Sequence, residues 1–351
     1  MLALFSCSCA PKPTPVAQAP VSSAPTTQPA SDGAETSAAE SKPAVKEAHK
    51  DTVELAAIVW SPFTDVPGKP RIANELVEQA LKRAGVTVHA HTTEAGDIVQ
   101  SIKEGKFDGS SALWKSPERE EYLLYSQAYL ENRLVLLARK GTDVSATKLG
   151  ALAGKRVGIV DGYAYGPQIE EAKNVQFVRV LSDELNMEAL LKKQVDYILV
   201  DDLLVYHLFE GETERAQRLL VAGTQPLIMQ GLHLALRKDL AGAPTIIKLF
   251  NEQITTMIRS GEYHKILNVN WMVAGTDGDG RPQWLASGPN AGAHPPSNRY
   301  QLFGPQMQGA PRFVIEGEVY DNWESIPEEN KIPNQPIASF RPAVNAVLFE
   351  F

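Results

Sequence analysis

Short apolar runs alternate with segments of helical periodicity along much of this chain, and this alternation restricts the possible folds more than any other feature. The pattern predicts strands at 53–60, 86–90, 107–113, 156–160, 175–181 and 195–200, and helices at 73–84, 98–104, 185–193 and 203–209. Strands that alternate with helices imply a largely parallel sheet. Because the pattern restarts after Gly150, we expect an α/β fold of two lobes with a ligand cleft between them.

Length and charge exclude two broad classes of protein. The chain has 351 residues, which is enough for two domains, and 43% of them are hydrophobic. The formal net charge of −8 gives nucleic acid no general electrostatic attraction, so we expect no nucleic-acid partner. No stretch approaches the roughly 20 apolar residues of a membrane-spanning helix.

Both cysteines, Cys7 and Cys9, lie at the N-terminus, so the rest of the chain can hold neither a disulfide framework nor a thiolate metal site. Residues 1–7 (MLALFSC) resemble the end of a bacterial lipoprotein signal, and this resemblance implies that Cys7 carries a lipid. Cys9 fits less well, since Ser6 would then occupy the apolar position. The basic region and longer apolar stretch of a full signal are missing. The frayed N-terminus of a cytosolic protein is the alternative interpretation.

Residues 8–51 consist almost entirely of Ala, Pro, Ser, Thr, Glu and Lys. A segment of this composition cannot bury enough apolar surface to offset its ordering entropy, and its prolines keep it extended. We therefore expect a disordered tether between a membrane anchor and a folded body that begins near residue 52.

Several short motifs resemble, in order, those of the bacterial extracellular solute-binding protein family 3, the periplasmic amino-acid receptors of ABC importers. In the first lobe these are WSPF at 60–63, GKFDG at 105–109, SPER at 116–119 and LYSQAY at 124–129; in the second they are GKRVGI at 154–159 and QVD at 194–196. The resemblance implies a two-lobed type II periplasmic-binding-protein fold. A discontinuous first lobe is expected at 52–140 and 229–273, a second lobe at 141–228, and a C-terminal extension at 274–351.

The same resemblance implies how a ligand is held. Arg119 occupies the family's carboxylate-binding position, where a guanidinium can donate two parallel hydrogen bonds. Asp201 matches the partner of the ligand's ammonium group, and Trp60 matches an aromatic side chain that packs on the ligand. With these residues in different lobes, one ligand would hold the cleft closed by a hinge motion. We also assign Phe63, Trp114 and Tyr163 to the site.

Each candidate residue also has a simpler interpretation. Arg119 lies among acidic residues and could form a solvated surface pair, and Asp201 could merely cap a helix. Trp60 and Phe63 could be core residues. His89 and His91 share one face of a strand but lack a third metal ligand in the sequence pattern, so we expect no metal and no cofactor.

Two departures from the family pattern concern the ligand. Trp114 stands where amino-acid receptors place a small hydroxyl residue, and GYAY at 162–165 replaces a common Gly-Thr-Thr. These bulkier side chains change the volume and hydrogen bonding of the cleft. An amino acid or close relative is expected; an acidic or unusual amino acid, or a small organic anion, also fits.

The extension has no assigned role. Its DGDG at 277–280 resembles a short calcium loop but lacks the closing glutamate of an EF-hand, which favours a plain polar turn. Residues 312–331 alternate apolar and polar side chains and predict a hairpin or small cap, with Gly317 as its turn.

We predict a monomeric binding protein, not an enzyme, that is lipid-anchored in the periplasm or at the cell surface and works with an importer permease. An envelope enzyme on the same fold, related to dehydratases or lyases, and a ligand sensor without transport are the alternatives.

Overall fold

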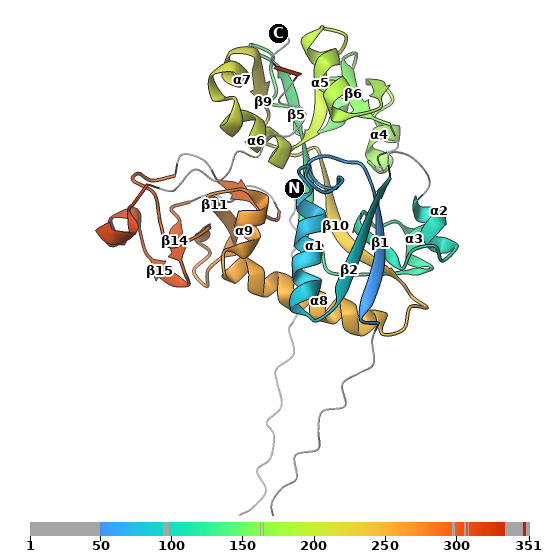
Figure 1. Cartoon of the computed structure of the whole chain (residues 1–351). Coiled ribbons are helices and arrows are strands. Elements are labelled where there is room, and N and C mark those ends of the chain that lie inside the picture. Colours follow the sequence, from blue (N-terminus) through green and yellow to red (C-terminus); the bar gives the residue numbers. More distant parts are fainter. Residues whose placement is uncertain are drawn as a thin grey trace, which may run out of the picture. The chain divides into compact units, whose positions relative to one another are not determined.

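The structure is a computed structural model (Figure 1) that describes residues 50–93, 98–161, 163, 165–296, 299–304, 307, 309–333 and 347–348. The expected lipid anchor at Cys7 and nearly all of the tether at 8–51 lie outside the described residues. The same holds for Gly162 and Ala164 of the GYAY motif, and for most of the chain after residue 333.

The first lobe is built on a mixed sheet in which β1 pairs in parallel with β2 and β3, and β10 joins antiparallel to β3 and β4. Its strands are β1 (Thr52–Ile58), β2 (Thr87–Thr93), β3 (Gly109–Leu113), β4 (Leu123–Tyr125) and β10 (Ile228–Arg237). Its helices are α1 (Ile72–Arg83), α2 (Ile98–Lys103), α3 (Pro117–Glu120), α8 (Ala243–Arg259) and α9 (Glu262–Leu267). The predicted βαβ order of this lobe is confirmed.

The second lobe repeats the arrangement: β6 pairs in parallel with β7 and β8, and β5 joins antiparallel to β8 and β9. Its strands are β5 (Leu130–Arg139), β6 (Arg156–Val160), β7 (Gln176–Val180), β8 (Tyr197–Asp201) and β9 (Leu220–Ala222). Its helices are η1 (Leu149–Leu152), α4 (Pro167–Glu171), α5 (Asp183–Leu191), α6 (Asp202–Gly211) and α7 (Thr213–Leu219).

Two ten-residue strands, β5 and β10, carry the chain between the lobes. They pair with each other over residues 130–134 and 228–232. Beyond this crossing, β10 pairs with first-lobe strands, whereas residues 134–138 of β5 pair with second-lobe strand β8. The boundary expected at residue 140 therefore falls at the end of a strand whose second half belongs to the second sheet. The first lobe is discontinuous in sequence, as the family resemblance implies.

Local sequence explains several of these elements. Helix α1 buries Leu76, Val77 and Ala80 on one face and ends before Gly85, whose φ of 79° favours glycine. Ser116 caps α3, with proline at the first turn, as the SPER motif predicts. Gly109 begins β3, where an added Cβ would lie 2.0 Å from the carbonyl oxygen of Ala235. Only glycine lets β3 approach β10 so closely.

The C-terminal extension forms a sheet of its own, with the strand order β13-β11-β12-β14-β15. Its first strand begins at Trp271, three residues before the boundary expected at residue 274. Its strands are β11 (Trp271–Thr276), β12 (Pro282–Ala286), β13 (Tyr300–Gln301), β14 (Arg312–Ile315) and β15 (Glu318–Tyr320), followed by the short 3-10 helices η2 (Trp323–Ser325) and η3 (Glu328–Asn330). The predicted hairpin is confirmed, because β14 and β15 pair antiparallel around Glu316 and Gly317. Trp271, Phe313 and Ile326 form the centre of its small core.

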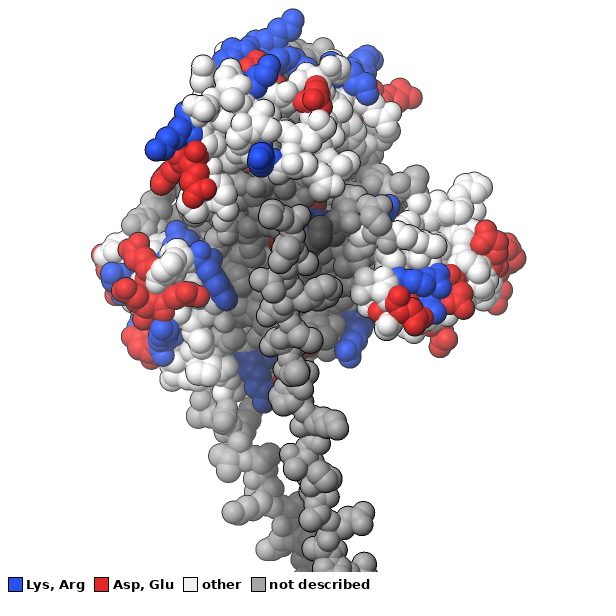
Figure 2. Space-filling view, turned by 180° about the vertical axis from the view of Figure 1, so that it is seen from behind, with Lys and Arg blue, Asp and Glu red and all other residues white. Residues whose placement is uncertain are grey.

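The described surface carries charges of both signs. On the face seen in Figure 2, Lys and Arg side chains lie near Asp and Glu side chains in several places. Among the described residues, no helix is both long and apolar enough to cross a membrane.

Candidate functional site

The candidate site lies at the carboxyl ends of parallel strands, where open α/β sheets bind ligands. Trp60 follows β1 and Trp114 follows β3 in the first lobe. Tyr163 follows β6, and Asp201 is the last residue of β8, in the second lobe. The structure therefore brings these four predicted residues to the facing sheet ends of the two lobes.

An aromatic cluster made of Trp60, Trp114, Tyr163 and Tyr165 joins the lobes. The Trp60 ring lies 5.2 Å from Tyr163 and 5.7 Å from Trp114, measured between ring centroids. Tyr163 lies 6.3 Å from Trp114 and 5.8 Å from Tyr165. These distances are those of interacting aromatic pairs. Because the rings come from both lobes, the two lobes touch each other at this cluster.

Phe63 lies beside the aromatic cluster but belongs to the hydrophobic core. Its side chain is 1% exposed, and its ring lies 4.5 Å from that of Trp60. Trp60 is half-buried. Phe63 therefore packs against Trp60, while Trp60 also contacts Tyr163 of the second lobe.

Asn132 links the aromatic cluster to Asp201. Trp114 Nε1 donates to Asn132 Oδ1 at 2.8 Å, and Asn132 Nδ2 donates to Asp201 Oδ2 at 2.9 Å. All three side chains are buried. Since Asn132 stands on the crossing strand β5, this hydrogen-bonded chain connects a first-lobe indole to a second-lobe carboxylate through the hinge.

Asp201 also caps helix α6, because its Oδ1 accepts from the backbone N–H of Leu203 at 2.9 Å. Burial raises the pKa of Asp201 to about 6, against the hydrogen bonds from Asn132 and Leu203 and the positive charge of Arg133. Asp201 therefore does cap a helix, as the simpler interpretation of the sequence predicts. It leaves room for a ligand, since a carboxylate has roughly four acceptor sites.

Arg119 is attached to the backbone of Trp114, to whose carbonyl oxygen its Nη1 donates at 3.0 Å. Its side chain is half-buried. In the part of the chain that the structure describes, it forms no ion pair with the acidic residues at 118, 120 and 121. The guanidinium keeps further N–H groups beyond the one that Trp114 accepts.

The structure adds Asp183, Tyr165 and Asn132 to the residues that sequence reasoning selected. Asp183 opens helix α5 and accepts from the Tyr163 hydroxyl at 3.2 Å. Burial, together with the neighbouring charge of Glu184, raises its pKa to about 7. Asp183 is the first residue of α5 and follows the cap Ser182, and an acid at a helix start shortly after a strand is a signal available in the sequence. Asn132 had no such signal, because its role depends on the strand crossing.

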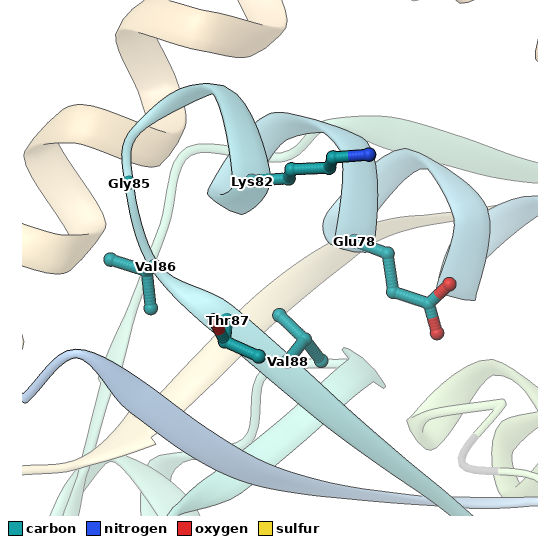
Figure 3. A pocket seen from close by; sticks show the side chains of 6 residues that line it. All are labelled: Glu78, Lys82, Gly85, Val86, Thr87 and Val88. Atoms are coloured by element: carbon teal, nitrogen blue, oxygen red, sulfur yellow. The ribbon is translucent and has the colours of Figure 1, made fainter.

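A separate groove of about 410 Å³ lies on the outer edge of the first lobe. It is lined by residues 78, 82 and 85–88, where α1 turns into edge strand β2 (Figure 3). Lys82 and Glu78 project from the helix beside it, and Glu78 pairs with Arg71. This groove lies at the amino end of a strand, so it is remote from the ligand position of an α/β sheet.

His89 and His91 both contact Glu54, with His89 Nδ1 2.8 Å from Oε1 and His91 Nε2 2.6 Å from Oε2. Glu54 is the nearby acid that the sequence pattern did not reveal. Even so, no group of three His, Cys, Asp or Glu side chains within the described ranges is arranged to hold a metal ion.

Two α/β lobes joined by crossing strands, with aromatic and carboxylate side chains at their facing ends, define a bilobal ligand-binding protein. The family profile of the bacterial extracellular solute-binding proteins, family 3, matches residues 65–273, and the chain belongs to this family.

Two curated relatives bind amino acids according to their names. The L-cystine-binding protein TcyJ of Escherichia coli K12 is 26% identical over 204 residues, which cover 57% of this chain and 73% of that protein. The probable histidine-binding protein of Campylobacter jejuni is 25% identical over 128 residues, or 36% of this chain. The match spans only half of the Campylobacter protein.

Solved structures confirm the fold. An ancestral arginine-binding protein bound to arginine superposes with a TM-score of 0.51 at 21% identity, over 62% of this chain and 97% of that one. The ligand-binding core of GluR0 from Nostoc punctiforme, solved with L-glutamate, also gives 0.51, at 17% identity over 62% and 97%. At these identities the likeness concerns the fold alone.

Proposed function

We propose that this protein is an extracytoplasmic receptor that captures an amino acid or a related small molecule by closing its two lobes, and delivers it to an ABC importer as a monomer. The observation that carries this proposal is the aromatic cluster shared by both lobes and tied to Asp201 through Asn132. A ligand that inserts between Trp60 and Tyr163 would contact both lobes at once.

The chemistry of the cleft suits a ligand with a positively charged nitrogen. Trp60 and Tyr163 offer aromatic faces, and Asp201 offers a carboxylate that no lysine or arginine pairs with directly in the described structure. Aromatic faces and carboxylates together stabilise ammonium groups. Arg119, with donors beyond the one used on Trp114, is proposed to receive the ligand's carboxylate when the lobes part.

A thermal-shift screen of the purified chain against the twenty amino acids, linear diamines and small organic acids tests the proposal. A ligand at 100 times its dissociation constant should stabilise the native state by about 2.7 kcal/mol. Trp60→Ala and Asp201→Asn should abolish the shift, whereas His89→Gln, at an exposed position on the far edge strand, should retain it. If no amino acid or related compound shifts the unfolding transition, the amino-acid proposal fails.

Membrane attachment through Cys7 is proposed from the N-terminal sequence, together with a location in the periplasm or at the cell surface. The two cysteines provide a matched pair of variants. Cys7→Ser should move the protein from the membrane fraction to the supernatant and abolish labelling by a radioactive fatty acid. Cys9→Ser should change neither. The opposite pattern would assign the lipid to Cys9.

Delivery to an importer is tested by uptake. Cells that lack the protein should lose high-affinity uptake of the radiolabelled ligand, and the wild-type gene should restore it. A ligand sensor would leave uptake unchanged.

A further inference from the structure

We propose that Asp183 receives a second positively charged group of the ligand, so that the cleft selects molecules with two cationic nitrogens, such as basic amino acids, over neutral amino acids. The proposal rests on the proposed function, because it assigns a ligand class to the same cleft.

The position of Asp183 follows from sheet topology. Strands β8, β6 and β7 are consecutive neighbours in the second-lobe sheet and run parallel. Their carboxyl ends therefore present Asp201, Tyr163 and Asp183 in a row. With neighbouring strands about 4.8 Å apart, β8, which ends in Asp201, and β7, which leads into Asp183, are separated by roughly 10 Å, and β6, which leads into Tyr163, lies between them. Lysine, whose ammonium stands on a four-carbon stem, can reach both.

No cation of the described structure pairs with Asp183. Its carboxylate accepts from the Tyr163 hydroxyl at 3.2 Å, and no Lys or Arg forms an ion pair with it among the residues that the structure describes. Arg179, the nearest basic residue on β7, is directed instead to Asp161 at 3.4 Å. Asp201 is better supplied with hydrogen bonds than Asp183, because one of its carboxylate oxygens accepts from Asn132 and the other from Leu203.

The cost of this arrangement indicates a role in binding. Burial and the acidic neighbours Glu184 and Asp201 disfavour the ionised form of Asp183. The hydrogen bond from the Tyr163 hydroxyl offsets part of this cost, and no Lys or Arg in the described structure pairs with the carboxylate. A ligand cation placed beside the Tyr163 ring would offset more of it. A residue that destabilises the empty protein but favours a bound ligand is typical of a binding site.

Calorimetric titration of the full chain with L-lysine and L-norleucine, which share a carbon chain but differ in the terminal ammonium, tests the inference. The wild type should bind lysine at least about 30-fold more tightly than norleucine. Asp183→Asn should remove this preference by weakening lysine alone, and it should raise the melting temperature of the ligand-free protein. Glu184→Gln, the neighbouring acid, should keep most of the preference.

The outcomes separate the two proposals. If the wild type binds norleucine or another neutral amino acid as tightly as lysine, the role of Asp183 is overturned and the proposed function stands. If Asp183→Asn lowers the melting temperature and keeps the lysine preference, the residue is structural and the inference is wrong. If neither amino acids nor diamines bind the wild type, the proposed function falls together with it.

Discussion

The guanidinium of Arg133 lies over the ring of Tyr300, 5.1 Å from its centroid, and so joins the crossing strand β5 to strand β13 of the C-terminal extension. The same guanidinium pairs with Asp202 at 2.6 Å and donates to the carbonyl oxygen of Gly304 at 3.2 Å. Glu131 in turn accepts from the N–H of Gly304 at 2.9 Å. Tyr300 and Gly304 therefore fasten the extension to the strand that connects the lobes, and Arg133 also binds Asp202, the first residue of helix α6.

Replacement of Arg133 should destabilise the protein strongly. Its side chain is only 3% exposed, and Arg133→Met would leave the half-buried carboxylate of Asp202 without its cation. Loss of one partner of a buried ion pair costs about 3–5 kcal/mol, as urea denaturation would measure. Arg83→Met, which breaks an exposed pair with Glu262, should cost less than about 1 kcal/mol.

A substitution of Asp202, the partner of Arg133, tests whether the lost charge pair causes this destabilisation. Asp202→Leu added to Arg133→Met should recover much of the lost stability, because the unpaired carboxylate is then removed. If the double variant is as unstable as Arg133→Met alone, the packing of Arg133 on Tyr300, and not its charge, holds the extension in place.

Substitution of Trp60 should mainly affect ligand binding, whereas substitution of Phe63 should mainly affect the stability of the core. Phe63 is 1% exposed, so Phe63→Ala should cost about 3–5 kcal/mol in unfolding free energy. Trp60 is half-buried, and Trp60→Ala should cost less, on the order of 1–2 kcal/mol, because it loses ring contacts with Trp114 and Tyr163.

Ligand titration completes this comparison. Trp60→Ala should weaken binding of whichever amino acid stabilises the wild type, and Trp60→Phe should restore part of the affinity. A Trp60→Ala variant with wild-type affinity would assign Trp60 to the core alone, the simpler interpretation that its sequence leaves open.

The sequence was sufficient to predict the two-lobed fold, because each βαβ unit carries its own periodicity and turn residues. The SPER motif likewise predicted the cap and proline that begin α3. Contacts that depend on which strands cross could not be predicted. Asn132 and Arg133 stand side by side in an apolar strand, and only the pairing of β5 with both β10 and β8 gives them their partners.

The sequence predicts those residues of the candidate site that lie at the ends of predicted strands. Trp114 and Tyr163 were selected as departures from a family pattern, and the structure brings them into one cluster. The sequence does not predict Asp183, because no motif singles out this first residue of α5. Its importance comes from Tyr163 and from burial, both of which are tertiary properties.

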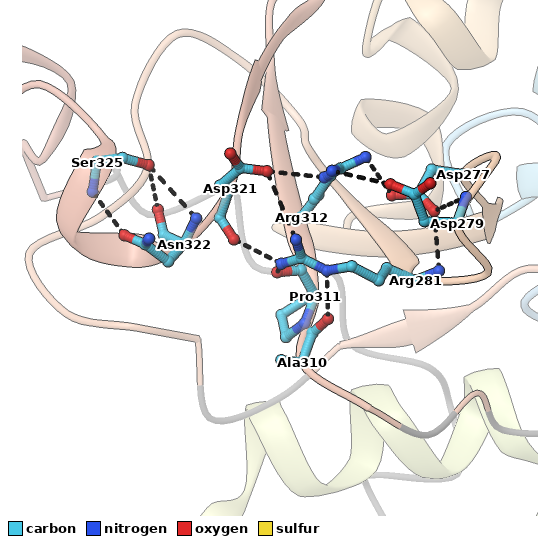
Figure 4. A network of polar contacts seen from close by, with 9 residues as sticks. All are labelled: Asp277, Asp279, Arg281, Ala310, Pro311, Arg312, Asp321, Asn322 and Ser325. Carbon is cyan, nitrogen blue, oxygen red and sulfur yellow. Dashed lines mark hydrogen bonds and ion pairs between the residues drawn. The ribbon is translucent and has the colours of Figure 1, made fainter.

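The DGDG turn should not respond to calcium. Asp277 Oδ1 accepts from the backbone N–H groups of Asp279 and Arg281, and its Oδ2 pairs with Arg312 at 2.7 Å (Figure 4). Arg312 also pairs with Asp279 and Asp321, so guanidinium groups already neutralise these carboxylates. This geometry agrees with the polar turn that the sequence favours.

Thermal unfolding with millimolar calcium and with a chelator should therefore give the same melting temperature. Asp277→Ala should lower the melting temperature in both conditions, because the turn between β11 and β12 loses its acceptor. Asp279→Ala, at a more exposed position, should have a smaller effect. A melting temperature that rises with calcium in the wild type but not in Asp277→Ala would restore the calcium interpretation.

Acid should destabilise the protein in part through His264, which is fully buried in helix α9. Burial lowers the pKa of His264 to about 4, whereas an unfolded histidine titrates near 6.5. The neutral ring therefore contributes its full stability above pH 6.5, and this contribution is lost as the pH falls from 6.5 to about 4. The expected loss is on the order of 3 kcal/mol, and it is isolated by comparing the wild type with His264→Gln.

The comparison is needed because the raised pKa values of Asp183 and Asp201 act in the opposite direction, favouring the folded state as these groups take up protons on acidification. Both carboxylates remain in His264→Gln, so their effect cancels in the difference between the two unfolding free energies. Burial also lowers the pKa of His207 to about 4, so the comparison of the wild type with His207→Gln should show a similar loss of stability in acid. A difference between the wild type and His264→Gln that stays constant from pH 7.5 to 4 would mean that His264 is as accessible to protons in the folded protein as in the unfolded chain.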